Sequence, residues 1–192
     1  MPDPNSAALD FLLNRRSRPA KTLGLPVPSR AEILPILTAA ARTPDHGKLE
    51  PWRFIVLNRT AILRLADLAE ARGHALGLPD DQIYKGHAPI RIGHLAVAVI
   101  ESPKPSDKIP PLEQTYSTGA VCLALLNAAL ASGWGANWLS GWPSHDRTFM
   151  TEGLALEAHE RIAGFIHIGT ETSAPPERPR PDLDAITTWQ DT

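Results

Sequence analysis

The stretch 112-LEQTYSTGAVCLALLNAALAS-132 decides the centre of the fold. It is the longest helical candidate in the sequence, and it is apolar on nearly all sides after Gly119. A helix that is apolar all round is normally buried, because it has no polar face to turn towards water. We therefore expect a central buried helix over 112–132, with the remaining elements arranged around it.

Helices and strands alternate on both sides of this stretch. Apolar residues at helical spacing, together with a Ser29–Glu32 capping box, predict helices over 6–16, 29–42 and 61–76. We also expect a polar helix near 144–153. Runs of β-forming or apolar residues predict strands over 52–57, 95–100, 135–139 and 163–168. We expect loops at 18–27 and 78–89, and an extended C-terminal arm. This order predicts a single α+β domain over 1–192, with a mixed sheet flanked by helices.

Composition excludes several classes of protein. The 192 residues carry a net charge of −2, so no strongly basic surface indicates binding to nucleic acid or to a membrane. The longest apolar run, near 121–130, is interrupted by Asn127 and is shorter than the roughly 20 residues that a membrane span needs. The N-terminus has neither the basic start nor the apolar stretch of a signal peptide, so we expect a cytoplasmic protein.

Cysteine and histidine usage indicates neither a thiol nucleophile nor a metal site. The single cysteine, Cys122, lies in an apolar run, and we expect a small buried hydrophobic residue rather than a reactive thiol. The seven histidines include no His-x3-His pair accompanied by a carboxylate, so we expect no metal.

Proline is the one unusual component, with 19 residues, about twice the average share of roughly 5%. The prolines gather at 2–28, 103–111 and 175–181. Extended proline-rich segments form no core by themselves. We therefore expect the terminal arms to wrap around a partner subunit.

Three arginines lie at the end of the first predicted helix. Arg15, Arg16 and Arg18, with Ser17 between them, form a local cationic site. Guanidinium groups suit phosphate because they donate two parallel hydrogen bonds, and the Ser17 hydroxyl is a further donor. The alternative is a solvated basic helix end that interacts favourably with the helix dipole.

A polar loop separates the second predicted helix from the first predicted strand. The segment 42-RTPDHGK-48 holds Arg42 and His46, and loops at the ends of rigid elements are where ligands often bind. The alternative is a simple helix stop, with Pro44 and Gly47 ending the helix.

A third segment, 133-GWGANWLSGW-142, combines glycines with tryptophans. The glycines allow the backbone to approach a flat ligand closely, and the tryptophans supply apolar walls. The alternative is an ordinary strand with tryptophans in the core and glycines in its loops.

The C-terminal arm carries Arg178 and Arg180 in 177-ERPRP-181. Two side chains one residue apart on an extended segment point to the same side, which suits an anion. The alternative is a disordered tail.

These segments, in this order, resemble the nitroreductase family, in particular its small YdjA-like branch. The resemblance covers nearly the whole chain and is carried by 12-LLNRRS-17, 41-ARTPDH-46, 51-PWRF-54, 138-WLSG-141, 164-GFIHIGT-170 and 178-RPRP-181. It implies a nitroreductase-like α+β fold and a homodimer with FMN bound at the subunit interface.

The resemblance also implies roles for single residues near the N-terminus. Arg15, Arg16 and Ser17 match the stretch that holds the phosphate and ribityl chain of FMN in one subunit. Arg42 and His46 match flavin contacts that come from the other subunit.

The later segments match the remaining contacts. Trp138, Leu139 and Ser140 match the loop beside the isoalloxazine, and Arg178 and Arg180 match C-terminal basic residues that reach the phosphate. Similar family members carry Arg at the position of Leu139, so we expect a different acceptor preference or flavin potential here.

The implied chemistry belongs to the cofactor, so no side chain is expected to act as a nucleophile. NADH or NADPH would reduce FMN, and an electron-poor small-molecule acceptor such as a nitroaromatic or a quinone would then be reduced in ping-pong turnover. Arg42 or Lys48 would stabilise the reduced flavin. Two other classes stay open: an FMN-binding carrier, sensor or flavin-consuming protein without general NAD(P)H reductase turnover, and a cofactor-free helical interaction protein.

Overall fold

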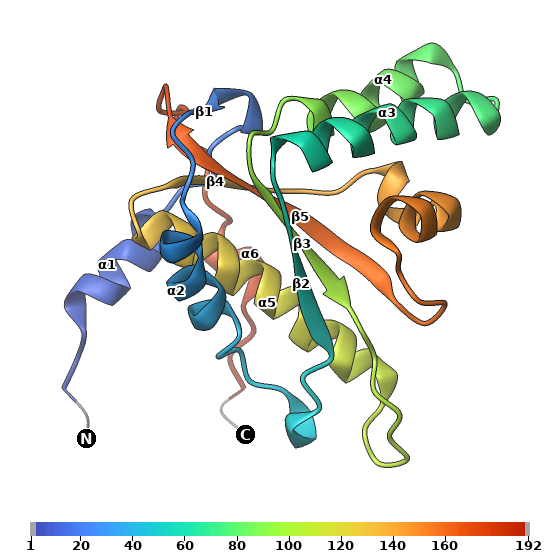
Figure 1. The fold of residues 1–192 in the computed structure, drawn as a ribbon. Helices are drawn as coiled ribbons and strands as arrows, with labels where there is room; N and C mark the ends of the chain where they lie inside the picture. The colour runs from blue at the N-terminus through green and yellow to red at the C-terminus, as the bar shows by residue number, and fades with distance from the viewer. Residues whose placement is uncertain (1–2, 191–192) are drawn as a thin grey trace.

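A single sheet lies at the centre of the computed structural model, which describes residues 3–190 (Figure 1). Its strands are β1 (Leu23–Gly24), β2 (Trp52–Leu57), β3 (Ala96–Glu101), β4 (Gly135–Leu139) and β5 (Arg161–Glu171). The order is β1-β5-β3-β2, and β4 also pairs with β5.

All pairings between these strands are antiparallel, so the expected mixed sheet is wrong. The reason lies between β2 and β3, where two helices follow each other, α3 (Arg59–Ala75) and α4 (Asp80–Arg91). A two-helix hairpin returns the chain to the end of the sheet where β2 finished, whereas one helix would have given a parallel crossover. The α+β class is confirmed.

Helices cover both faces of the sheet (Figure 1). On one face α2 (Arg30–Ala40) and α5 (Pro111–Ala131) pack on the sheet. On the other face α3, α4 and the π-helix η4 (Phe149–Gly153) form a second core. The central strand β3 is fully buried and alternates between these cores, with Ala96, Ala98 and Ile100 facing one and Val97 and Val99 facing the other.

The long helix α5 confirms the predicted helix over 112–132, but only one of its faces is buried. Val121, Cys122 and Leu125 are fully buried. Tyr116 and Leu123 are 66% and 45% exposed. The predicted central helix is therefore buried along one face, and its outer face is exposed in a single chain, because the chain supplies packing partners for one side only.

The segment 78–89, expected to be a loop, is largely helix α4. It is amphipathic but short of apolar residues, and it contains Pro89. Its buried residue Ile83 packs against the bare backbone of Gly73 on α3. Tertiary packing thus stabilises a helix that its own sequence indicates weakly.

The remaining elements are short. The predicted polar helix near 144–153 corresponds to a helical segment over 147–154, whose central part is the π-helix η4, in which Phe149 is fully buried. The 3-10 helix η3 (Trp142–His145) precedes it. The other elements are α1 (Ser6–Asn14), η1 (Ala20–Thr22), η2 (His46–Lys48) and α6 (Leu183–Ile186).

Local signals at α2 are confirmed. Ser29 and Glu32 form the capping box, with the Ser29 amide donating to Glu32 Oε2 at 2.8 Å. Pro35 lies inside α2 without ending it. Across residues 3–190, no helix is long and apolar enough to cross a membrane.

Candidate functional site

The arginines that follow α1 form a compact cationic cluster. Arg15 is the C-terminal cap of α1, and its amide donates to Phe11 O at 2.7 Å. Its guanidinium donates to the Ser17 hydroxyl at 3.0 Å. Arg16 donates to the carbonyl of Pro176, so the C-terminal arm passes this cluster.

Within residues 3–190, Arg15 and Arg16 form no ion pair, whereas Arg18 pairs with Glu171 at 2.8 Å. Burial lowers the pKa of the Arg15 guanidinium, and the charges of Arg16, Arg180 and Arg18 lower it further. The Nε atoms of Arg15 and Arg16 are buried and have no hydrogen-bond partner among residues 3–190. A buried donor without a partner is costly, so the cluster fits an anion that accepts hydrogen bonds.

Of the two arginines predicted in the arm, one joins this cluster. The charge of Arg180 acts on Arg15, and its guanidinium pairs with Glu177 at 2.9 Å. Arg178 is exposed, and within the described residues it has no ion pair. The structure therefore brings Arg15, Arg16, Ser17 and Arg180 together.

An apolar groove begins directly beyond Arg18. The Arg18 amide donates to Ala136 O at 2.8 Å, and the Asn137 side chain donates to Arg18 O at 2.7 Å, which fixes this segment to β4. The groove lies between Pro19–Lys21, the end of β4 and one face of α4, and it is lined mainly by apolar atoms: Pro19, Ala20, Lys21, Tyr84, Lys85, Ala88, Pro89, Ile92, Asn137 and Leu139.

The predicted loop 138–140 borders this groove. Leu139 lines it directly and makes it more apolar than an arginine at that position would. Ser140 lies beside Leu139 in a small adjoining cavity. Trp138 points to the opposite face of the sheet, where a Cβ on Gly164 would lie 2.6 Å from its Cδ1, so the glycine makes room for the indole.

Arg42 and His46 are not brought to the cluster within one chain. His46 Nδ1 lies 2.7 Å from Glu113 Oε2, at the first turn of α5. The arginine cluster shares a hollow with Leu130 and Gly133, at the other end of α5. A helix of 21 residues is about 30 Å long at 1.5 Å per residue, so the two groups are separated by that length.

Sequence reasoning missed the α4 wall of the groove. Tyr84, Lys85 and Ala88 lie on a helix that was expected to be a loop. The available signal was Asp80 and Asp81 directly after Pro79, because acidic residues favour the first turn of a helix.

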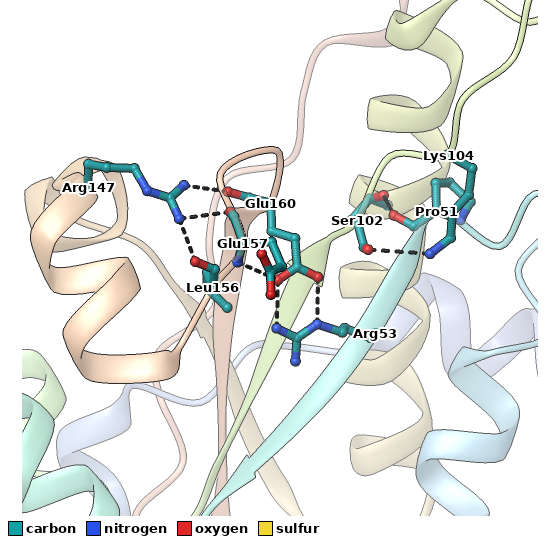
Figure 2. Close-up of polar contacts among 9 residues, drawn as sticks. Pro51, Arg53, Ser102, Lys104, Arg147, Leu156, Glu157 and Glu160 are labelled. Atoms are coloured by element: carbon teal, nitrogen blue, oxygen red, sulfur yellow. Dashed lines mark hydrogen bonds and ion pairs between the residues drawn. The ribbon is translucent and has the colours of Figure 1, made fainter.

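A second polar cluster, shown in Figure 2, is structural. Arg53 donates from Nε and Nη2 to both carboxylate oxygens of Glu160, at 2.6 and 2.7 Å. These hydrogen bonds lower the pKa of the buried Glu160 carboxyl to about 2. Arg147 donates to the carbonyls of Leu156, Glu157 and Glu160. Together they fix the turn before β5, away from the groove.

Two other expectations concern cysteine and metals. Cys122 is fully buried, as predicted, and burial raises the pKa of its thiol to about 12. Within residues 3–190, no three His, Cys, Asp or Glu side chains are grouped so that they could hold a metal ion.

Comparison with known proteins assigns the family. The sequence model of the nitroreductase family matches residues 13–170. The chain is 34% identical over 164 residues to a provisionally named NAD(P)H nitroreductase, YdjA, of Escherichia coli strain K12, and the match covers 85% of this chain and 87% of that relative. The chain therefore belongs to the nitroreductase family, a family of oxidoreductases.

Solved structures confirm the fold. A nitroreductase-like family protein from Bacillus cereus superposes with a TM-score of 0.76 at 21% identity, covering 100% of both chains. A provisionally assigned nitroreductase from Desulfovibrio desulfuricans, solved in complex with FMN, gives 0.74 at 20% identity, covering 100% of this chain and 99% of the other. The nitroreductase family uses FMN, so the expected cofactor is confirmed at the level of the family.

Proposed function

We propose that this chain binds FMN, with the phosphate among Arg15, Arg16 and Arg180 and the isoalloxazine in the groove over Leu139. One observation carries the proposal: the segment that carries the cationic cluster with its unpartnered buried donors runs on, from Pro19, into the segment that lines an apolar groove. FMN has the same two parts, a phosphate and a flat, largely apolar ring system. Ser17 and the exposed Arg178 are proposed as further contacts to the ribityl chain and the phosphate.

We propose further that the protein is a homodimer and that each FMN site draws on both subunits. The separation of Arg42 and His46 from the arginine cluster supports this, because another copy can bring one end of α5 near the other end of its partner helix. In that arrangement Trp138, Leu139 and Ser140 belong to the subunit that binds the phosphate, and the partner subunit contributes Arg42 and His46.

The outer face of α5 is suited to such an interface. Leu112, Tyr116 and Leu123 are 57%, 66% and 45% exposed and fall on one side of the helix. Gly119 lies between them, and a Cβ there would meet nothing within 4 Å. Contiguous exposed apolar residues of this kind are typical of protein interfaces.

The C-terminal arm also exposes large apolar side chains. Leu183, Ile186 and Trp189 are exposed, Trp189 by 84%. The arm follows β5 and carries the only turn of helix beyond it in the described residues, α6. A second copy of the chain would give these apolar side chains a surface to pack on, as the proline-rich composition predicts.

The activity proposed is oxidation of NADH or NADPH coupled to reduction of an electron-poor acceptor, such as a nitroaromatic or a quinone. FMN, once bound, supplies the two-electron transfer in ping-pong turnover. The chain supplies binding and electrostatics: Lys21 and Lys85 border the groove and can stabilise negative charge there. Arg42 and Lys48 can do so only from the partner subunit.

The experiment is direct. We expect purified protein to bind FMN, to absorb in the visible flavin bands, and to oxidise NAD(P)H when nitroaromatics, quinones or enones are added. Protein that stays colourless after incubation with FMN would refute the cofactor proposal. Protein that holds FMN but turns over no acceptor would instead be a flavin carrier, a sensor or a flavin-consuming protein.

A further inference from the structure

Trp142 connects the groove loop to α4. It follows the loop 139–141 directly and begins η3. Its indole Nε1–H donates to the carbonyl of Gln82 at 3.0 Å. The same ring lies against the bare backbone of Gly86, where a Cβ would come within 2.5 Å of Cε2 and 2.7 Å of Cζ2.

The contact with Trp142 explains why α4 has a glycine, Gly86, in its interior. Glycine costs a helix interior about 1 kcal/mol relative to alanine. At position 86, any side chain would overlap the indole, so the helix can lie this close to the loop only with glycine there.

A small cavity lies beside this contact. It has a volume of about 20 Å³ and lies between Gly86, Pro89 and Ile90 of α4 and the residues 139–141, 143 and 144. Pro89 has no N–H, so the carbonyl of Lys85 lacks its intrahelical hydrogen bond. The contact between Trp142 and Gly86 therefore lies at the edge of a space that the neighbouring side chains leave unfilled.

We infer that Trp142 is a positioning residue that sets the width of the groove, and thereby which acceptors fit above Leu139. The inference rests on the proposed function. The wall is formed by Tyr84 and Ala88 of α4 and by Ile92 directly after it, and the floor belongs to β4. The contact of Trp142 with Gly86 fixes the distance between wall and floor.

The test uses two substitutions in the full-length, FMN-loaded enzyme. Gly86→Ala forces α4 away from the indole, and Trp142→Phe shortens the spacer and removes the hydrogen bond to Gln82. The substrates are a matched pair of one-ring and two-ring acceptors, 1,4-benzoquinone and 1,4-naphthoquinone. We expect each variant to change the ratio of their KM values on the order of tenfold, since displacements near 1 Å have effects of this size or larger. FMN affinity should stay within about twofold, because the arginine cluster is untouched.

The combined variant and a control separate positioning from loss of stability. With both substitutions the effects should not add, because the smaller ring makes room for the new methyl group. Gly73→Ala is the control: its Cβ would lie 2.9 Å from Ile83 Cγ1, so it crowds α4 equally but away from the loop. An unchanged KM ratio in Gly86→Ala, additive effects, or the same change in Gly73→Ala would each overturn the inference.

A second measurement does not depend on flavin. In flavin-free protein, Trp142→Phe should accelerate hydrogen exchange at the Ser144 amide, which donates to Gly141 O at 2.9 Å, while Gly73→Ala should leave it unchanged. If wild-type protein binds no FMN, the proposed function fails, and this exchange experiment still decides whether Trp142 fixes the loop. Equal exchange in all three proteins would refute the positioning role.

Discussion

Arg15 and Arg180 come from opposite ends of the chain and act on each other. Burial is the main reason why the pKa of the Arg15 guanidinium is lowered, and the charges of Arg16 and Arg180 lower it further. Arg180 is paired with Glu177 at 2.9 Å, whereas Arg15 and Arg16 have no ion pair within residues 3–190. The positive charges around Arg15 therefore favour binding of an anion.

Replacing either arginine should weaken FMN binding. Arg15→Ala and Arg180→Ala each remove one charge-assisted hydrogen-bond donor, which contributes about 1.5–3 kcal/mol. We expect FMN affinity, measured by quenching of flavin fluorescence, to fall between about tenfold and a hundredfold. Arg30→Ala, at the exposed start of α2, is the control and should bind as wild type. Wild-type affinity in both cluster variants would show that the phosphate lies elsewhere.

A charge on the outer face of α5 should dissociate the dimer. Leu123→Glu places a carboxylate in the proposed apolar interface, where burial of an unpaired charge is strongly unfavourable. Sedimentation should detect monomers that keep wild-type helicity but bind FMN poorly. Leu76→Glu, at an equally exposed leucine of the α3–α4 hairpin, should stay dimeric. A wild-type protein that is already monomeric would contradict the assembly.

The buried His167 should make the protein less stable as the pH falls below neutrality. His167 is 2% exposed, and burial lowers the pKa of its imidazole from 6.5 to about 4. Between these two values the unfolded chain binds more protons than the folded one, so the free energy of unfolding declines as the pH falls from 6.5 to about 4. The loss attributable to this group is about 3 kcal/mol.

Chemical denaturation across this pH range, with His167→Asn as the variant, measures that loss. The variant has no imidazole at position 167 and should lose less stability on acidification. The same change at the exposed His159 is the control. Parallel curves for wild type and His167→Asn would argue against a neutral buried imidazole.

The Arg53–Glu160 pair should lose its contribution to the free energy of unfolding at a lower pH than His167 does. Because hydrogen bonds from Arg53 lower the pKa of the Glu160 carboxyl from 4.5 to about 2, its contribution is complete above pH 4.5 and is lost as the pH falls towards 2. Glu160→Gln should lower the free energy of unfolding at pH 7 by about 1–3 kcal/mol. FMN affinity should not change, since the pair lies away from the groove. Asp67→Asn, at an exposed ion pair with Arg91, should have a smaller effect on stability.

Much of the fold follows from local sequence, and the exceptions have a physical cause. The strands at 52–57 and 135–139 and the capped helix after Ser29 were predicted because each carries its own signal. Helix α4 was missed because Gly86 and Pro89 oppose helix formation locally. It is stabilised by contacts with Gly73 and Trp142, which sequence periodicity does not show.

The candidate site also has one part that the sequence predicted and one part that it did not. Charge and spacing predicted a cationic cluster of Arg15, Arg16 and Ser17, and of the two arginines predicted in the C-terminal arm the structure brings Arg180 to it. The groove could not be predicted, because its wall and floor belong to α4 and β4, which are far apart in sequence. The antiparallel sheet was missed for the same reason, since its direction depends on the second helix of the α3–α4 hairpin.

The length of α5 has a further consequence in the proposed dimer. If its two ends hold complementary halves of each site, FMN binds two chains together, and assembly and cofactor binding become thermodynamically linked. Added FMN should then shift the monomer–dimer equilibrium towards the dimer, and dilution should release flavin even when free FMN is held constant. Apparent FMN affinity would depend on the concentration of the protein itself.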